Sequence, residues 1–338
     1  MAGVSVAIWA PAHLNRDRLF KENRDDCLAA FRSLKARIEQ AGGQCRTHDL
    51  FQADGVVPDF VIFMDIPAQP VRKLVGSWFG RTRCWVILQE PGLILPRNYD
   101  LERHGEFERI FTWDDRLVDG SRYLKLNYGH LFPEEVSRDV AGQRKLCVMI
   151  AGNRKSDRSG ELYSERESAI RWFEERHPAD FDLYGFGWDR RVFAGNRLLR
   201  GLNRMTWLAR LLVQRHPSWR GTVASKRPVL KQYRFAICYE NCDSPGYVTE
   251  KIFDCFFAGC VPVYWGASNV TERIPAGCFI DKRKFPDYEE LYRFMKSMSD
   301  LDYRRYLDNI ETFLGGDRAY AFSCQAFAET VANGIICE

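Results

Sequence analysis

Polar residues suited to binding phosphate and sugar are concentrated between Arg234 and Gly266. This stretch predicts strand, loop, helix and strand, because short apolar runs at 235–239 and 261–265 enclose a turn-rich loop and a segment with helical spacing. Glu250 and Lys251 fall in the first turn of the helix, where backbone N–H groups lack partners and an anion is favoured. The lysine would therefore favour a phosphate, and the glutamate could accept hydrogen bonds from sugar hydroxyls.

The predicted helix has two different faces. The apolar residues of one face repeat at three and four residues and can pack on a sheet; they are Val248, Ile252, Cys255 and Phe256. Tyr247, Glu250, Lys251 and Asp254 fall together on the opposite, polar face. We expect Tyr247 to share the opening turn of the helix with Glu250 and Lys251.

Three further residues stand where α/β proteins bind their ligands, at or near the carboxyl ends of predicted strands. Glu90 follows the apolar run CWVIL, and such a carboxylate could accept a proton from a hydroxyl group or simply stabilise a turn. Asn153 also follows a strand-like run, and it could orient a ligand or form an Asx turn. Arg166 opens a helix at 164–176, where its planar guanidinium could meet two phosphate oxygens or lie in solvent.

Size and composition allow two packed cores. Of the 338 residues, 46% are hydrophobic and 14% aromatic. The formal net charge of +4 is small beside 49 basic and 45 acidic side chains, so the charge does not favour nucleic acid. From Arg190 to Arg234, both ends included, twelve Lys or Arg residues occur without Asp or Glu. That stretch is either a solvated basic face or a surface for a phosphorylated donor, an anionic glycan or an anionic lipid headgroup.

Several common motifs are missing from the sequence. It contains no P-loop and no GxSxG nucleophile elbow, and its six histidines lack ligand spacing, so no metal site is expected. The eleven cysteines form no CxxC pair and several lie in apolar runs, which favours a reducing compartment. Without a signal peptide or a segment long enough to span a bilayer, we expect a cytoplasmic protein, with any membrane contact peripheral and at the inner membrane.

Alternating strand and helix patterns predict an α/β fold with two doubly wound domains. An N-terminal domain would cover residues 1–140, a C-terminal domain 141–318 and a helical tail 319–338, with the boundary in the polar segment 133–144. The strand ends of the two domains would face a common cleft. The tail carries apolar residues at helical spacing, and we expect it to dock on the fold rather than on a membrane.

The expected elements are spread over the whole chain. The predicted strands are 4–10, 60–64, 84–88, 109–112, 123–126, 145–153, 181–184, 235–239 and 261–265. Besides the helix that carries Lys251, the predicted helices are 24–40, 68–78, 164–176, 288–299 and 302–313.

The segment from Tyr233 to Val270 resembles the signature of the α-1,3-fucosyltransferases, glycosyltransferase family 10. Its FAICYEN, YVTEK and AGCVPVYWG match the family's F-x-x-x-F-E-N, Y-V-T-E-K and A-G-x-V-P-V-x-x-G. The N-terminal half resembles the family more thinly, through FTWDD and through Gln89-Glu90-Pro91 in place of Glu-Ser-Pro. The chain departs from the pattern because Tyr239 replaces a Phe, no Ser separates Glu90 from Pro91, and heptad repeats of the bacterial members are missing.

The resemblance implies a soluble, bacterial-type enzyme of GT-B architecture, with two Rossmann-like domains. The C-terminal domain would hold a GDP-sugar and the other domain a saccharide acceptor. L-Fucose would pass from GDP-fucose to a hydroxyl of the saccharide with inversion, with Glu90 as general base and no metal or other cofactor. Lys251 and Arg166 would meet the diphosphate and Glu250 the nucleotide ribose. The donor-binding residues predicted in all are Asn153, Arg166, Glu240, Asn241, Tyr247, Glu250 and Lys251.

Two alternatives to this interpretation stay open. The chain could use a different nucleotide sugar on the same GT-B fold, since few hydrogen bonds distinguish one hexose from another. It could also be a nucleotide-sugar-binding protein without catalysis. The expected partners are a nucleotide sugar and a saccharide acceptor, with no nucleic acid and with peripheral contact to a membrane or a lipid-linked glycan.

Overall fold

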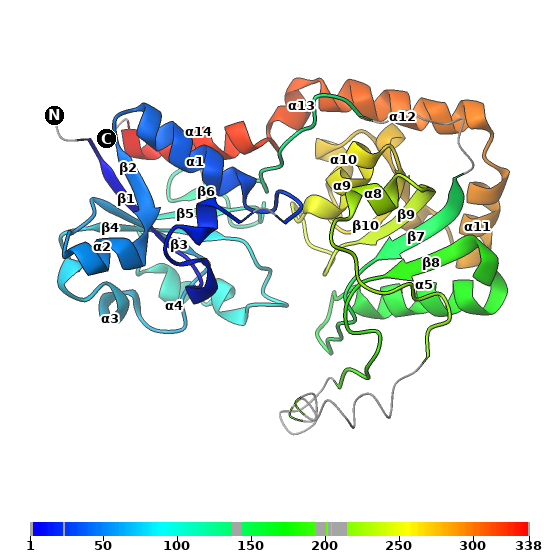
Figure 1. Cartoon of the computed structure of the whole chain (residues 1–338), viewed down its shortest axis with the longest axis horizontal. Coiled ribbons are helices and arrows are strands. Elements are labelled where there is room, and N and C mark those ends of the chain that lie inside the picture. Colours follow the sequence, from blue (N-terminus) through cyan, green and yellow to red (C-terminus); the bar gives the residue numbers. More distant parts are fainter. Residues whose placement is uncertain are drawn as a thin grey trace. The chain divides into compact units, whose positions relative to one another are not determined.

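The chain folds into two compact units, each built on one parallel sheet (Figure 1). The structure, a computed structural model, describes residues 3–22, 24–136, 144–193, 201, 204 and 215–336. Unit 1 comprises Met1–Phe132, Pro245–Tyr247 and Asp317–Glu338. Unit 2 comprises Pro133–Ser244 and Val248–Gly316. The division places the C-terminal tail with the N-terminal part of the chain.

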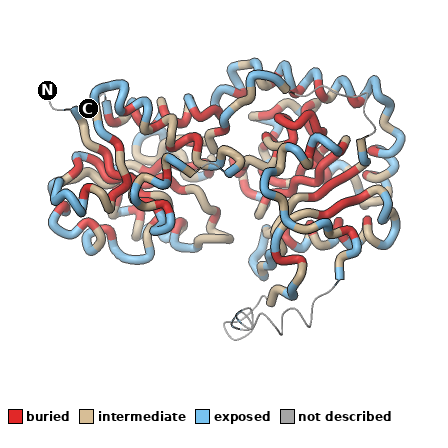
Figure 2. Tube along the Cα trace, viewed as in Figure 1, coloured by how far each residue is buried: buried red, intermediate tan, exposed pale blue. Residues whose placement is uncertain are grey.

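Unit 1 contains a six-stranded sheet in the order β2-β1-β3-β4-β5-β6, and all neighbouring strands are parallel. The strands are β1 (Ser5–Trp9), β2 (Gln44–Thr47), β3 (Phe60–Met64), β4 (Arg83–Leu88), β5 (Arg109–Thr112) and β6 (Tyr123–Lys125). The strands β3 and β4 are apolar and buried on both faces, as expected for a parallel sheet covered by helices. Figure 2 shows this burial along the strands and the exposure of the outer helices.

Helices cover both faces of the unit 1 sheet. They are α1 (Ala29–Gln40), α2 (His48–Asp54), α3 (Val71–Val75), α4 (Leu101–His104), α13 (Asp317–Tyr320) and α14 (Cys324–Ile336). The helices α1 and α14 pack together on one face, where the rings of Phe31 and Phe327 lie 5.5 Å apart. On the other face, Phe51 of α2 and Val71 of α3 share a core cluster with Val61. The predicted docking of the tail on the fold is therefore confirmed.

Unit 2 contains a five-stranded parallel sheet in the order β11-β10-β9-β7-β8. The strands are β7 (Lys145–Ile150), β8 (Phe181–Tyr184), β9 (Tyr233–Tyr239), β10 (Val261–Trp265) and β11 (Ile280–Asp281). The helices are α5 (Tyr163–Arg176), α8 (Arg227–Leu230), α9 (Glu250–Ala258), α10 (Val270–Arg273), α11 (Tyr288–Ser297) and α12 (Asp300–Leu314). The connection from β7 through α5 to β8 runs toward one end of the sheet, and the connection from β9 through α9 to β10 runs toward the other end. Because such crossovers are right-handed, α5 and α9 cover opposite faces of the sheet (Figure 1).

In each sheet, one pair of neighbouring strands connects onward toward opposite ends of the sheet. In unit 1, β1 leads to β2 and its neighbour β3 leads to β4. In unit 2, β7 leads to β8 and its neighbour β9 leads to β10. Ligands of open α/β sheets bind beyond the carboxyl ends of the strands at such topological switch points. The predicted doubly wound architecture is confirmed, and it indicates one ligand-binding edge in each unit.

The observed elements differ from the expected ones mainly at helix starts. Each predicted strand is confirmed to within a few residues. The elements that were not predicted are β2, β11, α2 and the one-turn helices α4, α8, α10 and α13. The first helix begins at Ala29 rather than 24, because Asp25 and Asp26 adopt left-handed backbone conformations with φ of 49° and 54°. The segment expected as a helix at 68–78 is helical only from Val71 to Val75, followed by a 3₁₀ turn.

The helix that carries Lys251 also begins later than expected, at Glu250. Thr249 has an extended backbone with φ of −107° and ψ of −167°, and Gly246 has a φ of +81°. The expectation that Tyr247 shares the opening turn with Glu250 and Lys251 is therefore wrong. Among the residues that the structure describes, no helix combines the length and the apolar character needed to cross a bilayer.

Candidate functional site

A buried carboxylate organises the carboxyl edge of unit 2. Glu240 directly follows β9, and none of its surface is exposed. Its oxygens accept hydrogen bonds from Thr249 N at 2.8 Å, from Thr249 Oγ1 at 2.8 and 3.0 Å, and from Lys251 Nζ at 2.9 Å. A buried carboxylate is costly unless it is paired and hydrogen-bonded, so these contacts stabilise it. The residue that ends β9 thus fixes the position of the lysine in α9.

Lys251 presents a fixed positive charge at this edge. Its side chain is 21% exposed, and Nζ lies 3.0 Å from Thr249 Oγ1 and 3.9 Å from Glu250 Oε1. Burial alone would lower the pKa of Lys251, but the carboxylates of Glu240 and Glu250 outweigh it and raise this pKa above its ordinary value. An ammonium has three donors, and within the described residues two of them have acceptors, in Glu240 and Thr249. The third donor can meet a ligand.

Arg166 brings a second cation to the same edge. It lies in the first turn of α5 and is only 5% exposed, so the interpretation as a solvated arginine is wrong. Nε and Nη2 donate to the carbonyl oxygen of Tyr239 at 3.2 and 2.6 Å, and Nη2 donates to Asn241 Oδ1 at 3.0 Å. The positive charge of Arg166 lies close enough to Lys251 to act on the pKa of that lysine in the lowering direction. A dianionic group would relieve the repulsion between the two cations.

Glu250 is held ionised in the first turn of α9. Burial would raise its pKa, but Lys251 and Lys226 outweigh this and hold the pKa of Glu250 well below its usual range. Lys226 Nζ lies 3.2 Å from Glu250 Oε1 and 2.8 Å from Asp254 Oδ2, and so bridges two successive turns of α9. At neutral pH the Glu250 carboxylate can therefore only accept hydrogen bonds, as from ribose hydroxyls.

The other predicted donor-site residues have different surroundings. Asn241 lies in the unit 2 cluster, because its Oδ1 accepts from Arg166. Asn153 follows β7, and its Nδ2 donates to the carbonyl oxygens of Gly187 and Arg190 at 2.9 and 3.1 Å. Tyr247 belongs to unit 1, where it is 2% exposed and its ring lies 4.6 Å from that of Trp113. The structure thus brings Arg166, Glu240, Asn241, Glu250 and Lys251 together in unit 2, with Asn153 at the neighbouring strand end.

Glu90 stands at the corresponding edge of unit 1, in a turn whose backbone is fixed. Asp65, which follows β3, accepts from Gln89 N at 2.6 Å, from Glu90 N at 3.0 Å and from Asn98 Nδ2 at 2.7 Å. Asn98 Nδ2 also donates to the carbonyl oxygen of Glu90 at 2.8 Å. The carbonyl oxygen of Gln89 accepts from Trp113 Nε1 at 2.9 Å and from the Tyr128 hydroxyl. Both amides and both carbonyls of this dipeptide therefore have defined partners.

Asp65 adopts a strained conformation to hold this turn. Its φ of +61° lies in the left-handed region, which aspartate tolerates better than most residues. Burial raises the pKa of Asp65, and its hydrogen bonds to Gln89, Glu90 and Asn98 only partly offset the effect. Strained residues of this kind persist where the surroundings over-determine them, often near functional sites. The half-buried Glu90 side chain therefore starts from a rigid backbone.

The sequence did not indicate Asp65, Asn98 or Lys226 as site residues. Asp65 and Glu90 are 25 positions apart, and Lys226 and Glu250 are 24 apart, so only the fold brings them together. One signal was available for the lysine: Glu250 and Asp254 are four residues apart on one helix face, where a cation can bridge them. The strain at Asp65 has no sequence signature.

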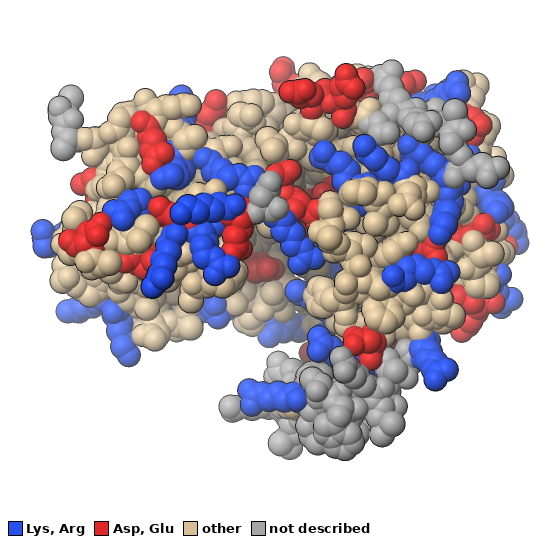
Figure 3. Space-filling view, viewed as in Figure 1, with Lys and Arg blue, Asp and Glu red and all other residues tan. Residues whose placement is uncertain are grey.

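The predicted basic stretch is described only in part. Arg197, Arg200 and Arg210 lie outside the described residues. Of the described members, Arg220 pairs with Asp182 at 2.5 Å and Arg234 with Asp300 at 2.9 Å. Figure 3 likewise shows Lys and Arg interspersed with Asp and Glu on the visible face. For these members, ion pairing within unit 2 is the structural role that the contacts support.

A metal site was not expected, and the described part of the chain contains no group of three or more His, Cys, Asp or Glu side chains arranged to hold a metal ion.

Comparison with protein families matches residues 213–325 to the C-terminal part of glycosyltransferase family 10 (fucosyltransferase). An α-(1,3)-fucosyltransferase of Helicobacter pylori is 36% identical over 74 residues, which are 22% of this chain and 16% of that protein. An α-(1,4)-fucosyltransferase of Arabidopsis thaliana is 39% identical over 71 residues, 21% of this chain and 18% of that protein. The matched segments thus span less than a fifth of these curated relatives.

Solved structures resemble the chain over nearly its whole length. The crystal structure of an α1,3-fucosyltransferase with GDP is 14% identical, covers 99% of this chain and 90% of its own, and gives a TM-score of 0.56. The crystal structure of an α1,3-fucosyltransferase with GDP-fucose gives a TM-score of 0.53 at the same identity and coverage. A glycosyltransferase from Rickettsia africae is 10% identical, covers 99% and 98%, and gives 0.55. These similarities show that the fold is that of GT-B glycosyltransferases.

Proposed function

We propose that this chain, whose residues 213–325 match the C-terminal model of glycosyltransferase family 10, transfers L-fucose from GDP-fucose to a hydroxyl group of a saccharide. The observation that carries the proposal is the unit 2 cluster, in which Lys251 and Arg166 bring two positive charges to the carboxyl edge of β9. That edge contains the topological switch point of the sheet, where α/β folds bind nucleotides. The similar α1,3-fucosyltransferase structures with GDP and GDP-fucose support the same donor.

The proposed donor contacts follow from charge and hydrogen-bonding capacity. Lys251 and Arg166 bind the diphosphate, and the ionised Glu250 accepts hydrogen bonds from the ribose hydroxyls. Glu240 acts through Lys251, because its buried carboxylate fixes the ammonium. Asn241 orients Arg166. Asn153 and Tyr247 complete the proposed donor-binding set, with Asn153 beside the edge at the end of β7.

The reaction places negative charge on the departing nucleotide. As the bond between the anomeric carbon and the phosphate oxygen breaks, that oxygen gains charge, which fixed cations stabilise without having to reorganise. Lys251 is already positioned by Glu240 and Thr249, so little rearrangement is needed when the substrate binds. The acceptor oxygen forms its bond to the anomeric carbon on the opposite side, and the configuration inverts.

Glu90 is the proposed general base. It would take the proton of the acceptor hydroxyl as the new glycosidic bond forms, leaving GDP and a neutral carboxylic acid. The fixed Gln89–Glu90 turn supports this role, because a base must be positioned within hydrogen-bonding distance of the proton that it removes. A fixed turn would also let the Glu90 carboxylate hold the acceptor hydroxyl in one reactive orientation.

Asp65 should act as a positioning residue for Glu90. Asp65→Gly keeps the positive φ possible but removes the shared acceptor of three hydrogen bonds, and we expect kcat to fall by roughly 10- to 100-fold. The KM for GDP-fucose should change little, since the donor cluster lies in unit 2. Asp65→Asn is the matched control, because it retains an acceptor oxygen and tolerates the left-handed conformation. Equal losses in both variants, or a change confined to KM, would contradict the positioning role.

A panel of nucleotide sugars tests the donor directly. The melting temperature should rise with GDP and GDP-fucose and change less with UDP- or ADP-sugars, because a ligand bound only by the folded protein stabilises it by mass action. We expect the same shift in melting temperature, and the same transfer activity, when EDTA is present. The reason is that Lys251 and Arg166 would stabilise the diphosphate charge without a metal ion. A stronger shift with another nucleotide sugar would favour the alternative donor. GDP binding without transfer to any saccharide would favour a binding protein.

The cellular location and acceptor are parts of the same proposal. Cysteines such as Cys147, Cys238 and Cys255 are buried among apolar residues and serve as small core side chains, which suits a reducing compartment such as the cytoplasm. A glycan precursor assembled there on a lipid would bring the enzyme to the inner membrane only through its acceptor. The acceptor is therefore proposed as a saccharide, free or lipid-linked.

A further inference from the structure

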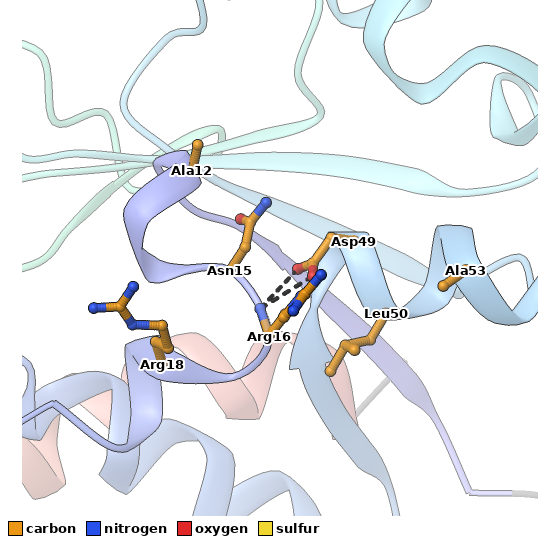
Figure 4. Close-up of a pocket in the computed structure, with 7 residues that line it drawn as sticks. All are labelled: Ala12, Asn15, Arg16, Arg18, Asp49, Leu50 and Ala53. Carbon is orange, nitrogen blue, oxygen red and sulfur yellow. Dashed lines mark hydrogen bonds between the residues drawn. The ribbon is translucent and has the colours of Figure 1, made fainter.

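Unit 1 contains a pocket of about 690 Å³ that the proposed donor site and Glu90 do not use (Figure 4). Its polar lining consists of Asn15, Arg16, Arg18 and Asp49, and its apolar lining consists of Ala12, Leu50 and Ala53. Residues 12–18 come after β1, and the other three lie on α2, which follows β2 directly. The pocket thus opens at the carboxyl edge of the sheet. Because β1 belongs to the switch point of unit 1, a ligand is expected there.

A strained corner of the backbone shapes this pocket. Arg16 and Asp17 both adopt left-handed conformations, with φ of 57° and 58°. The Asp49 carboxylate accepts from Arg16 N at 3.0 and 3.3 Å, as drawn in Figure 4. Asp17 N donates to Thr47 Oγ1 at 2.9 Å, and Thr47 N donates to Asp17 Oδ1 at 2.8 Å. Two successive strained residues that are held by side-chain contacts favour a functional role for this corner.

The lining favours a sugar ring over other ligands. Asn15 lines the pocket, and its buried Oδ1 has no hydrogen-bond partner among the residues that the structure describes. A turn of this amide toward a bound ring would let Oδ1 accept from a donor such as a hydroxyl group. The planar groups of Asn15, Arg16 and Asp49 can each address neighbouring hydroxyls, while Ala12 and Leu50 offer apolar surface to C–H groups. A phosphate is disfavoured because the Asp49 carboxylate lines the pocket. No aromatic ring on which a base could stack is found among the described lining residues.

The sheet order sets the separation between this pocket and Glu90. Glu90 follows β4, and β3 lies between β4 and β1. Two strand spacings amount to roughly 10 Å, and the β2 side of the pocket lies one spacing further. A sugar in the pocket is therefore too far from Glu90 to be the ring that carries the reacting hydroxyl.

We infer that this pocket binds a second sugar unit of an oligosaccharide acceptor, separated by at least one ring from the unit that is modified. This inference rests on the proposed saccharide acceptor, and it adds that the acceptor contains at least three units. Short saccharides would bind only near Glu90, whereas longer ones would also fill the pocket. Affinity should therefore increase with chain length until the pocket is filled, and then level off.

Two variants and a matched control test the inference. Ala53→Trp fills the pocket from an exposed position of α2, and Asn15→Ala removes the unpartnered oxygen. Ala36→Trp makes the same change at an exposed position of α1, which packs on the other face of the sheet. The probe is an array of gluco-, galacto- and N-acetyllactosamine oligosaccharides of one to six units, and each protein's GDP affinity is measured in parallel.

We expect the unaltered protein and Ala36→Trp to bind oligosaccharides of three or more units at least tenfold more tightly than disaccharides of the same series. Ala53→Trp and Asn15→Ala should lose that tenfold preference while keeping their GDP affinity. If the protein binds GDP but shows no length preference, or if the pocket variants retain it, the inference is overturned. If the protein binds neither GDP nor GDP-fucose, the proposed function fails, whatever the array shows.

Discussion

Glu90→Gln lowers kcat by about 10²- to 10⁴-fold, the usual contribution of a general base, and leaves the affinity for GDP unchanged. The amide has the size of the carboxylate but cannot accept the proton of the acceptor hydroxyl. The turn should keep its shape, because its hydrogen bonds to Asp65 and Asn98 involve the backbone of Glu90 rather than its side chain. Single-turnover transfer from GDP-fucose, with calorimetry of GDP, measures both quantities.

The matched control for this variant is Glu102→Gln. Glu102 is an exposed glutamate of α4 in the same unit, so its replacement removes the same charge away from the proposed base. Its kcat should stay within twofold of the wild-type value, as is usual for surface changes that touch no functional group. A fully active Glu90→Gln protein would exclude Glu90 as the base and leave the acceptor hydroxyl to be activated by another group.

Lys251→Met has the second largest expected effect, and it acts on both function and stability. Removing a fixed donor at the site of developing charge should lower kcat by about 10²- to 10³-fold and weaken GDP binding. The fully buried Glu240 would lose its cation, and breaking a buried pair from one side costs about 3–5 kcal/mol of unfolding free energy. Chemical denaturation and transfer kinetics should therefore both change.

A double variant separates these two effects. Glu240→Gln combined with Lys251→Met removes the buried charge together with its partner, so most of the lost stability should return. Activity should stay as low as in Lys251→Met, because the cation is still missing. Lys231→Met, at an exposed lysine of unit 2, controls for the loss of a positive charge in general. Recovery of activity in the double variant would mean that Lys251 serves the fold and not the nucleotide.

The fold could be predicted from the sequence because buried parallel strands have a simple signature. The strands Phe60–Met64, Arg109–Thr112 and Val261–Trp265 are short and centred on apolar or β-branched residues, and each was located to the residue. Helix starts were harder, because they depend on single backbone conformations. The left-handed Asp25 and Asp26 and the extended Thr249 each delay a helix that its side-chain pattern would start earlier.

The candidate site could be predicted only where its residues are close in sequence. Glu240, Asn241, Glu250 and Lys251 lie within one strand–loop–helix segment, so their proximity follows from that local structure. Arg166 was correctly placed in the first turn of α5, but its burial against Tyr239 depends on the packing of α5 beside β9. The roles of Lys226 and Asp65 depend on long-range contacts alone.

A crystal structure with GDP bound tests the central claim most directly. Our account predicts that oxygens of the diphosphate lie within hydrogen-bonding distance, about 2.7–3.2 Å, of Lys251 Nζ and of the Arg166 guanidinium, with a ribose hydroxyl on Glu250. A nucleotide bound away from the carboxyl edge of β9, or a diphosphate that contacts neither cation, would contradict it.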